Sequence, residues 1–153
     1  MTRHHWVWLA LAGALLGLIA APLAAQTDKA TYLAEARQGV VEITPEQLRT
    51  RLAGELPPLV LDVRTFTERE QGRTVTEQEI HIPRGFLEMK AWEQLPTGQE
   101  VVIYCGTGGR SALAAQTLKA MGWEQVMSLQ GGITAYYESV GEDCGCIELP
   151  FAQ

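Results

Sequence analysis

The segment Cys105-Gly106-Thr107-Gly108-Gly109-Arg110-Ser111 combines a thiol, a glycine-rich loop and a cation between a predicted strand and a predicted helix. Glycines let the backbone curl so that successive N–H groups point inward and form a nest for an anion, which the start of a helix reinforces. Thiolates are favoured beside helix N termini and cations, and Arg110 supplies a fixed positive charge. We therefore predict that Cys105 is a nucleophile and that residues 106–111 bind the anion formed on it.

Different roles for Cys105 fit the sequence less well. A buried cysteine before an ordinary glycine turn would not require the ordered succession of strand, cysteine, glycines, arginine and helix. A Cys-His hydrolase needs an imidazole base, and after residue 25 the chain offers only His81. His81 alternates with Ile80 and Ile82, which predicts a sheet residue at an edge. The loop also lacks the third glycine of a dinucleotide fingerprint, because Ser111 stands in its place.

The elements that must position this loop alternate between strands and helices. Thr44 as N-cap, Pro45 at the first helical position and Gln47 form a helix-start signature. We predict helices from residue 45 to about 53, over 111–121 and over 133–140, and strands at 40–43, 59–63, 79–82, 100–105 and 125–129. This order predicts an α/β fold with a parallel sheet covered on both faces. Cys105 then lies at the carboxyl end of a buried strand, where ligands bind in such sheets.

The two ends of the chain differ from this pattern. Residues 1–25 contain a charge-free apolar run ending in Pro22 and small residues, which predicts a signal peptide and an exported, periplasmic or secreted protein. The alternative is a membrane anchor, because the run approaches the length of about 20 residues that spans a bilayer. Residues 26–39 are interpreted as a linker or short N-terminal helix, 40–141 as a single domain, and 142–153 as a C-terminal tail.

The net charge and the cysteines of the chain limit which binding partners and cofactors are expected. The net charge is −6 at pH 7, which disfavours nucleic acid and anionic membrane surfaces, so membrane contact is expected only through an uncleaved leader. Cys144 and Cys146 in the tail are interpreted either as disulfide partners or as secondary thiols that receive sulfur from Cys105. A Cys-x-Cys pair is too small for a complete metal site, and we expect neither a metal nor an organic cofactor.

Four segments together resemble the rhodanese family. Leu59-Val60-Leu61-Asp62-Val63-Arg64 is similar to its opening segment, Val102-Ile103-Tyr104-Cys105 to its catalytic strand, and 111–115 to the helix after the loop. Residues 126–132 are similar to the family's last strand and double glycine. The resemblance covers about residues 40–140 and implies a rhodanese-like domain of about five parallel strands. It also implies that Cys105 takes sulfane sulfur, from thiosulfate or a persulfide, and passes it to cyanide, a small thiol or a thioredoxin-like protein.

The same resemblance frames the alternatives. Phosphatase and arsenate-reductase relatives have five residues between Cys and Arg, whereas four separate Cys105 from Arg110, which favours sulfur chemistry. A non-catalytic module that binds a sulfur anion or a redox partner is a third hypothesis. Many thiosulfate-using members have Arg directly after the cysteine, where this chain has Gly106. One cation for a dianionic donor is therefore missing.

Two further segments of the family pattern carry weaker assignments. The family's "GHIPGA" segment corresponds either to His81-Ile82-Pro83-Arg84-Gly85 or to residues 75–79. Under either register, Asp62 and Arg64 are expected to support the structure by orienting backbone and ion pairs. The alternative for Arg64 is a solvated charge.

Overall fold

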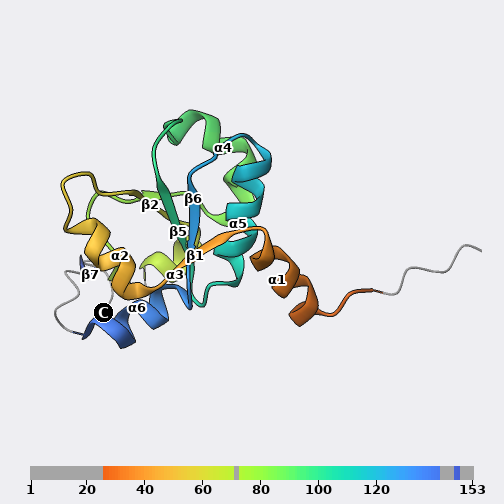
Figure 1. Cartoon of the computed structure of the whole chain (residues 1–153), viewed down its shortest axis with the longest axis horizontal. Helices are drawn as coiled ribbons and strands as arrows, with labels where there is room; N and C mark the ends of the chain where they lie inside the picture. Colours follow the sequence, from red (N-terminus) through yellow and green to blue (C-terminus); the bar gives the residue numbers. More distant parts are fainter. Residues whose placement is uncertain (1–25, 71–72, 142–146, 149–153) are drawn as a thin grey trace, which may run out of the picture.

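A five-stranded parallel sheet forms the centre of the protein, and the computed structural model describes residues 26–70, 73–141 and 147–148. Its strands follow the order β1-β6-β5-β2-β4 (Figure 1). Their bounds are β1 Val41–Ile43, β6 Val126–Leu129, β5 Val101–Tyr104, β2 Leu59–Asp62 and β4 Ile80–His81. The predicted α/β fold and the parallel sheet of about five strands are confirmed.

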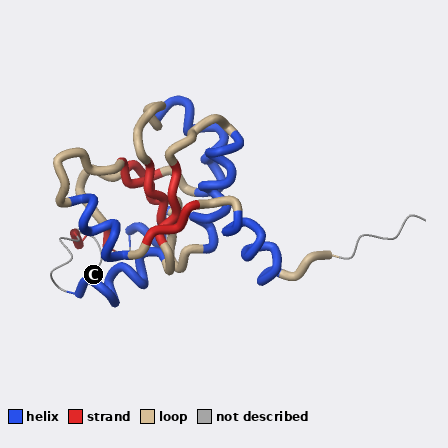
Figure 2. The backbone as a smooth tube through the Cα atoms, viewed as in Figure 1, coloured by secondary structure: helices blue, strands red, loops and turns tan. Residues whose placement is uncertain are grey.

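Helices cover both faces of this sheet (Figure 2). On one face α5 (Gly109–Ala120) packs on β5 and β6, and α1 (Lys29–Gln38) and α4 (Leu87–Gln94) pack against α5. On the other face lie α2 (Pro45–Leu52) and α6 (Gly132–Val140), which contact each other. Within the described residues, no helix combines the length and the apolar character needed to cross a membrane.

Strand β5 shows how the sequence divides the core. All four of its residues are buried, as expected for a central parallel strand. Because side chains alternate along a strand, Val101 and Ile103 face the α4 and α5 side together with Cys105. Val102 and Tyr104 belong to the core on the α2 and α6 side. The thiol and the phenol of adjacent residues therefore lie on opposite faces of the sheet.

Local signals place the helices well, with one correction. The expected capping box of α2 is present: Thr44 Oγ1 accepts from Gln47 N, and Gln47 Oε1 accepts from Thr44 N. The predicted start of α5 was wrong by two residues, since the helix begins at Gly109 rather than Ser111. Gly108, with φ of 91°, ends the loop in the left-handed region and lets the next residues turn directly into the helix. Arg110 and Ser111 thus belong to the first helical turn.

Several short elements were not predicted from the sequence. They are α3 (Phe66–Glu70), the 3₁₀ turn Arg84–Phe86, α4, and a small antiparallel pair of β3 (Arg73–Thr74) with β7 (Ile147–Glu148). The predicted signal peptide lies outside the described residues, as do Cys144 and Cys146. A helix within the predicted segment 26–39 spans Lys29–Gln38.

Candidate active site

Cys105 follows β5 directly and is the nucleophile candidate of the loop. Its side chain is buried, and its Sγ accepts a hydrogen bond from Gly108 N at 3.2 Å. The thiol is also 3.8 Å from Ser111 Oγ in the first turn of α5. The sulfur is therefore enclosed by the curled loop and faces the N-terminal end of a 12-residue helix, where partial positive charge favours an anion.

Two buried hydroxyl groups lie behind the thiol. Ser128 Oγ in β6 donates to Ser111 Oγ at 2.9 Å, and Ser111 Oγ donates to the carbonyl of Gly108 at 3.0 Å. Both serines are fully buried. Sequence reasoning placed Ser111 in the loop but missed Ser128, because a single serine in an apolar strand does not reveal which side chain it will meet.

The double glycine after β6 fixes the loop from the other side. Ile133 N donates to the Cys105 carbonyl at 2.8 Å, and Thr134 N donates to the Gly106 carbonyl at 3.2 Å. A Cβ on Gly132 would lie 2.4 Å from the Cys105 oxygen, and its φ is 63°. Only glycine allows α6 to approach the loop this closely. The start of α6 therefore holds the backbone of Cys105 and Gly106 in place.

Arg110 pairs with a carboxylate, and its charge also interacts with Cys105. Its Nη1 and Nη2 donate to Glu68 Oε2 and Oε1 at 2.7 and 2.5 Å. Glu68 is itself fixed by Thr65, whose N–H and hydroxyl both donate to Oε2 at 3.0 and 2.8 Å. The hydrogen bonds from Arg110 lower the pKa of Glu68 to about 2, and Glu68 in turn raises the pKa of Arg110.

This ion pair lies beside Gly106. A Cβ built on Gly106 would be 3.5 Å from Arg110 Nη2 and 3.6 Å from Glu68 Oε1. A cation at the start of a helix is unfavourable unless an anion lies nearby, and Glu68 supplies that anion. Sequence reasoning missed Glu68, although the spacing Thr65-x-x-Glu68 is a capping-box signature that could have revealed the short helix α3.

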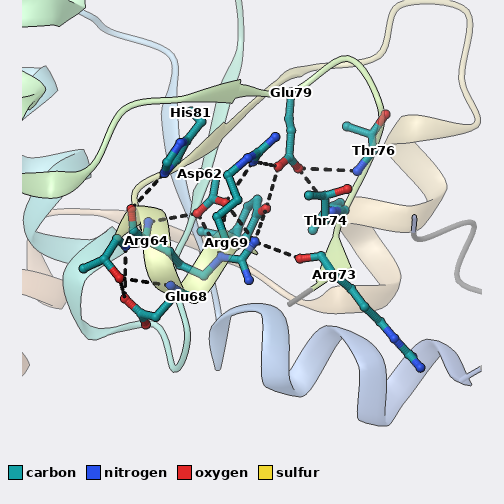
Figure 3. Close-up of polar contacts among 12 residues, drawn as sticks. Asp62, Arg64, Glu68, Arg69, Arg73, Thr74, Thr76, Glu79 and His81 are labelled. Carbon is teal, nitrogen blue, oxygen red and sulfur yellow. Dashed lines mark hydrogen bonds and ion pairs between the residues drawn. The ribbon is translucent and has the colours of Figure 1, made fainter. Parts of the chain in front are cut away.

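Asp62 and Arg64 belong to a buried ionic network (Figure 3). This network includes Tyr104, which lies on the face of the sheet opposite to that of the Cys105 thiol. Arg64 Nη2 and Arg69 Nη1 donate to Asp62 Oδ2 at 2.8 and 3.0 Å, and Arg69 also pairs with Glu79. Tyr104 OH donates to Glu79 Oε1 at 2.8 Å and accepts from Arg64 Nη2 at 3.2 Å. The network contains two carboxylates and two guanidinium groups.

Burial and ion pairing have opposite effects on the pKa values of the carboxyl groups in this network. Burial is the largest single influence and would raise the pKa of Asp62, but the hydrogen bonds and charge of Arg64 together with the hydrogen bond from Arg69 outweigh it, so the pKa is lowered. Burial raises the pKa of Glu79, and burial together with the nearby carboxylates raises the pKa of Tyr104. Arg64 is only 3% exposed, so the alternative of a solvated charge at this position is wrong.

The segment from His81 to Arg84 lies beside the carboxyl end of β2. Ile82 N donates to the Asp62 carbonyl at 3.0 Å, and Arg84 N donates to the Val63 carbonyl at 3.1 Å. Ile82 and Arg84 are therefore hydrogen-bonded to the carboxyl end of β2, and the assignment of the family's motif to residues 81–85 or to residues 75–79 stays a prediction. The expected edge position of His81 is confirmed, because β4 ends the sheet. Its Nε2 lies 3.0 Å from the Arg64 carbonyl, well within the structural network.

The described residues contain no cluster of three or more potential metal-ligating His, Cys, Asp or Glu side chains. The groups around the thiol are a backbone N–H, a helix start, two hydroxyls and one paired guanidinium. These groups can hold and orient a sulfur anion, and they place the protein in the class of α/β domains that carry a buried cysteine directly after a central parallel strand.

The chain belongs to the rhodanese-like domain family, whose model matches residues 44–139. A sulfurtransferase of Allochromatium vinosum is 36% identical over 97 residues, which cover 63% of this chain and 88% of that protein. A putative sulfur carrier protein of Bacillus subtilis is 30% identical over 102 residues and is matched over 54% of its own length. The chain is thus a member of a family with sulfurtransferase relatives.

Solved structures agree with this family. A Rhodopseudomonas palustris protein described as a possible tyrosine phosphatase aligns with a TM-score of 0.61 and 27% identity, covering 76% of this chain and 96% of that one. The rhodanese-like domain of an Anabaena protein aligns with a TM-score of 0.58 and 25% identity, covering 65% and 74%.

Proposed function

We propose that this protein is a sulfurtransferase that carries sulfane sulfur as a persulfide on Cys105. The observation that supports the proposal best is the enclosed Cys105 Sγ, which accepts a hydrogen bond from Gly108 N at the start of α5. A persulfide anion on this sulfur would be stabilised by the loop N–H groups and the helix end. The sulfurtransferase relative supports the same reaction class.

The reaction would proceed in two displacements. The Cys105 thiolate attacks the outer sulfur of the donor, a new S–S bond forms on Cys105, and the donor's remaining group leaves with the electron pair of the broken bond. An acceptor thiolate then attacks the outer sulfur of the persulfide, and Cys105 leaves as a thiolate. No net oxidant or reductant is consumed in this exchange.

Phosphoryl transfer is the competing candidate, because one solved relative is described as a possible tyrosine phosphatase. Four residues separate Cys105 from Arg110 here, and Arg110 is already paired with Glu68. The short loop leaves little space for a tetrahedral dianion, and the ion pair leaves little positive charge to bind it. We therefore favour sulfur transfer.

Mass spectrometry of the purified protein after incubation with a persulfide donor tests the proposal. We expect an added mass of one sulfur atom on Cys105, removal of that mass by an acceptor thiol, and no loading in Cys105→Ser. A double variant Cys144→Ser/Cys146→Ser is the control, since it keeps Cys105 as the remaining cysteine. Hydrolysis of p-nitrophenyl phosphate without sulfur loading would contradict the proposal.

A further inference from the structure

A pocket lies next to the catalytic loop, between α1 and the start of α5. It has a volume of about 400 Å³, and its walls are Lys29, Tyr32, Leu33 and Arg37 of α1 with Thr107, Gly109, Arg110 and Leu113. Figure 1 shows α1 beside α5. Because the family model matches residues 44–139, one wall of this pocket comes from a helix that lies outside the family domain.

Helix α1 is seated firmly enough to form a wall. Asp28 caps its first turn by accepting from Ala30 N and Thr31 N at 2.9 and 3.1 Å. A Cβ built on Gly109 would lie 3.4 Å from Leu33 Cδ1, so Leu33 packs directly on the start of α5. At the other end of α1, Lys119 Nζ donates to the Gly39 carbonyl at 2.9 Å. The helix is therefore attached to α5 near its middle, through Leu33, and at its C-terminal end, through Gly39.

The walls have a distinct chemical character. Three of the lining residues are cationic and none is acidic, although the whole chain has a net charge of −6. The charge of Arg110 is offset by Glu68, and that of Arg37 by Glu42, whose Oε1 lies 3.5 Å from Arg37 Nε. Lys29 has no ion pair among the described residues. Leu33, Leu113 and the ring of Tyr32 provide apolar surface between these charges. Such a surface suits a small anionic molecule with an aliphatic part.

We propose that this pocket binds the non-reacting part of a small organic thiol, or of its persulfide, that carries carboxylate groups. The inference rests on the proposed sulfurtransferase function, which gives such a molecule its role as acceptor or donor. Thr107 of the loop after Cys105 and Gly109 and Arg110 at the start of α5 line the pocket, so a molecule held here lies beside the loop and can direct its sulfur toward it. As acceptor, its thiolate attacks the outer sulfur of the Cys105 persulfide, the S–S bond to Cys105 breaks, Cys105 leaves as a thiolate, and the acceptor departs as the new persulfide.

Binding of S-methylglutathione tests the pocket without any sulfur transfer, because the blocked sulfur cannot react. We expect backbone amide resonances of residues 29–37 and 107–113 to shift in a ¹⁵N NMR titration. Lys29→Gln should weaken binding about two- to fivefold, because an exposed charge pair contributes modestly. The diethyl ester of the probe, which lacks both carboxylates, should bind more weakly than the parent compound.

Arg51→Gln is the matched control, since it removes a cation of α2 that pairs with Glu100 on another part of the surface. Equal binding by the parent probe and its ester, or equal weakening by Lys29→Gln and Arg51→Gln, would contradict the pocket. Sulfur loading of Cys105 in the unmodified protein is measured in parallel. Loading without charge-dependent binding overturns this inference alone, whereas absence of loading overturns the proposed function.

Discussion

The Arg110 guanidinium and the Glu68 carboxylate face each other through two hydrogen bonds of 2.7 and 2.5 Å, beside the residue that follows Cys105. The charge that the loop offers to an incoming anion is therefore largely offset within the protein. Both side chains are more than one third exposed, so the pair contributes modestly to stability. Its main consequence concerns the charge of the molecules that reach the thiol.

The titration of Glu68 provides a direct check of this pair. Its pKa is about 2 in the folded protein against an ordinary 4.5, mainly because of the hydrogen bonds from Arg110. A lowered folded-state pKa means that the stabilisation is present above pH 4.5 and is lost as the pH falls toward 2. NMR titration of the Glu68 carboxyl carbon should show this value, and in Arg110→Gln it should return toward 4.5. An unchanged value in that variant would show that Thr65 alone lowers it.

Glu68→Gln should make the site more receptive to dianionic donors. The substitution keeps a side chain of the same shape but leaves the charge of Arg110 without its partner. We expect kcat/KM for thiosulfate to rise about five- to thirtyfold, equivalent to ~1–2 kcal/mol, because hydrogen bonds to charged groups are worth this much. Steady-state kinetics at low and moderate salt measure the change, which salt should reduce. Glu88→Gln, which breaks the Arg84 pair on α4, is the control and should have no such effect.

Arg64 and Arg110 should differ in what their loss affects. Arg64→Met leaves the fully buried Asp62 with one fewer partner, so we expect a loss of about 3–5 kcal/mol in the free energy of unfolding. Arg110→Gln should cost less than about 1 kcal/mol, because its ion pair is partly exposed. Urea denaturation separates the two. Activity compared at equal folded fraction should fall more in Arg110→Gln, and the opposite order would reverse our division between site and scaffold.

The contrast between these arginines also shows how far the sequence alone could lead. The parallel sheet, the central position of β5 and the loop after Cys105 were predictable, because apolar strands, glycines and a helix start follow local rules. Glu68 was not found, because the Arg110 pair joins residues 42 positions apart. The buried network could not be predicted either, since Glu and Arg are ordinarily exposed and nothing in the sequence marks Glu79 and Arg69 as buried. Only the arrangement of strands brings their charges together.

Gly132→Ala should displace the loop that follows Cys105. The added Cβ would lie 2.4 Å from the Cys105 carbonyl oxygen, and φ of 63° adds backbone strain. We expect a loss of about 1–3 kcal/mol in stability and lower sulfur loading of Cys105 at equal folded fraction. Gly98→Ala is the control for backbone strain without a steric clash, because φ of Gly98 is 81° and nothing lies within 4 Å of the new Cβ. Equal loading rates in the two folded variants would show that Gly132 serves stability alone.

The remaining prediction concerns Gly106, which follows Cys105 directly and carries no charge. A Cβ there makes ordinary contacts of 3.5 Å with Arg110 Nη2 and 3.6 Å with Glu68 Oε1, so a side chain fits without displacing the loop. In Gly106→Arg the new guanidinium can share Glu68 and leave Arg110 available to the donor. We expect kcat/KM for thiosulfate to rise about five- to thirtyfold relative to that for a less highly charged persulfide. Gly106→Ala adds the Cβ without the charge and should show no rise in kcat/KM.

A double variant tests whether the effect passes through Arg110. Because Gly106→Arg and Glu68→Gln both act on Arg110, the gain from Gly106→Arg should be smaller when Glu68→Gln is already present. An equal gain in Gly106→Ala, or full additivity with Glu68→Gln, would show that the charge of Arg110 is not what limits the use of a dianionic donor.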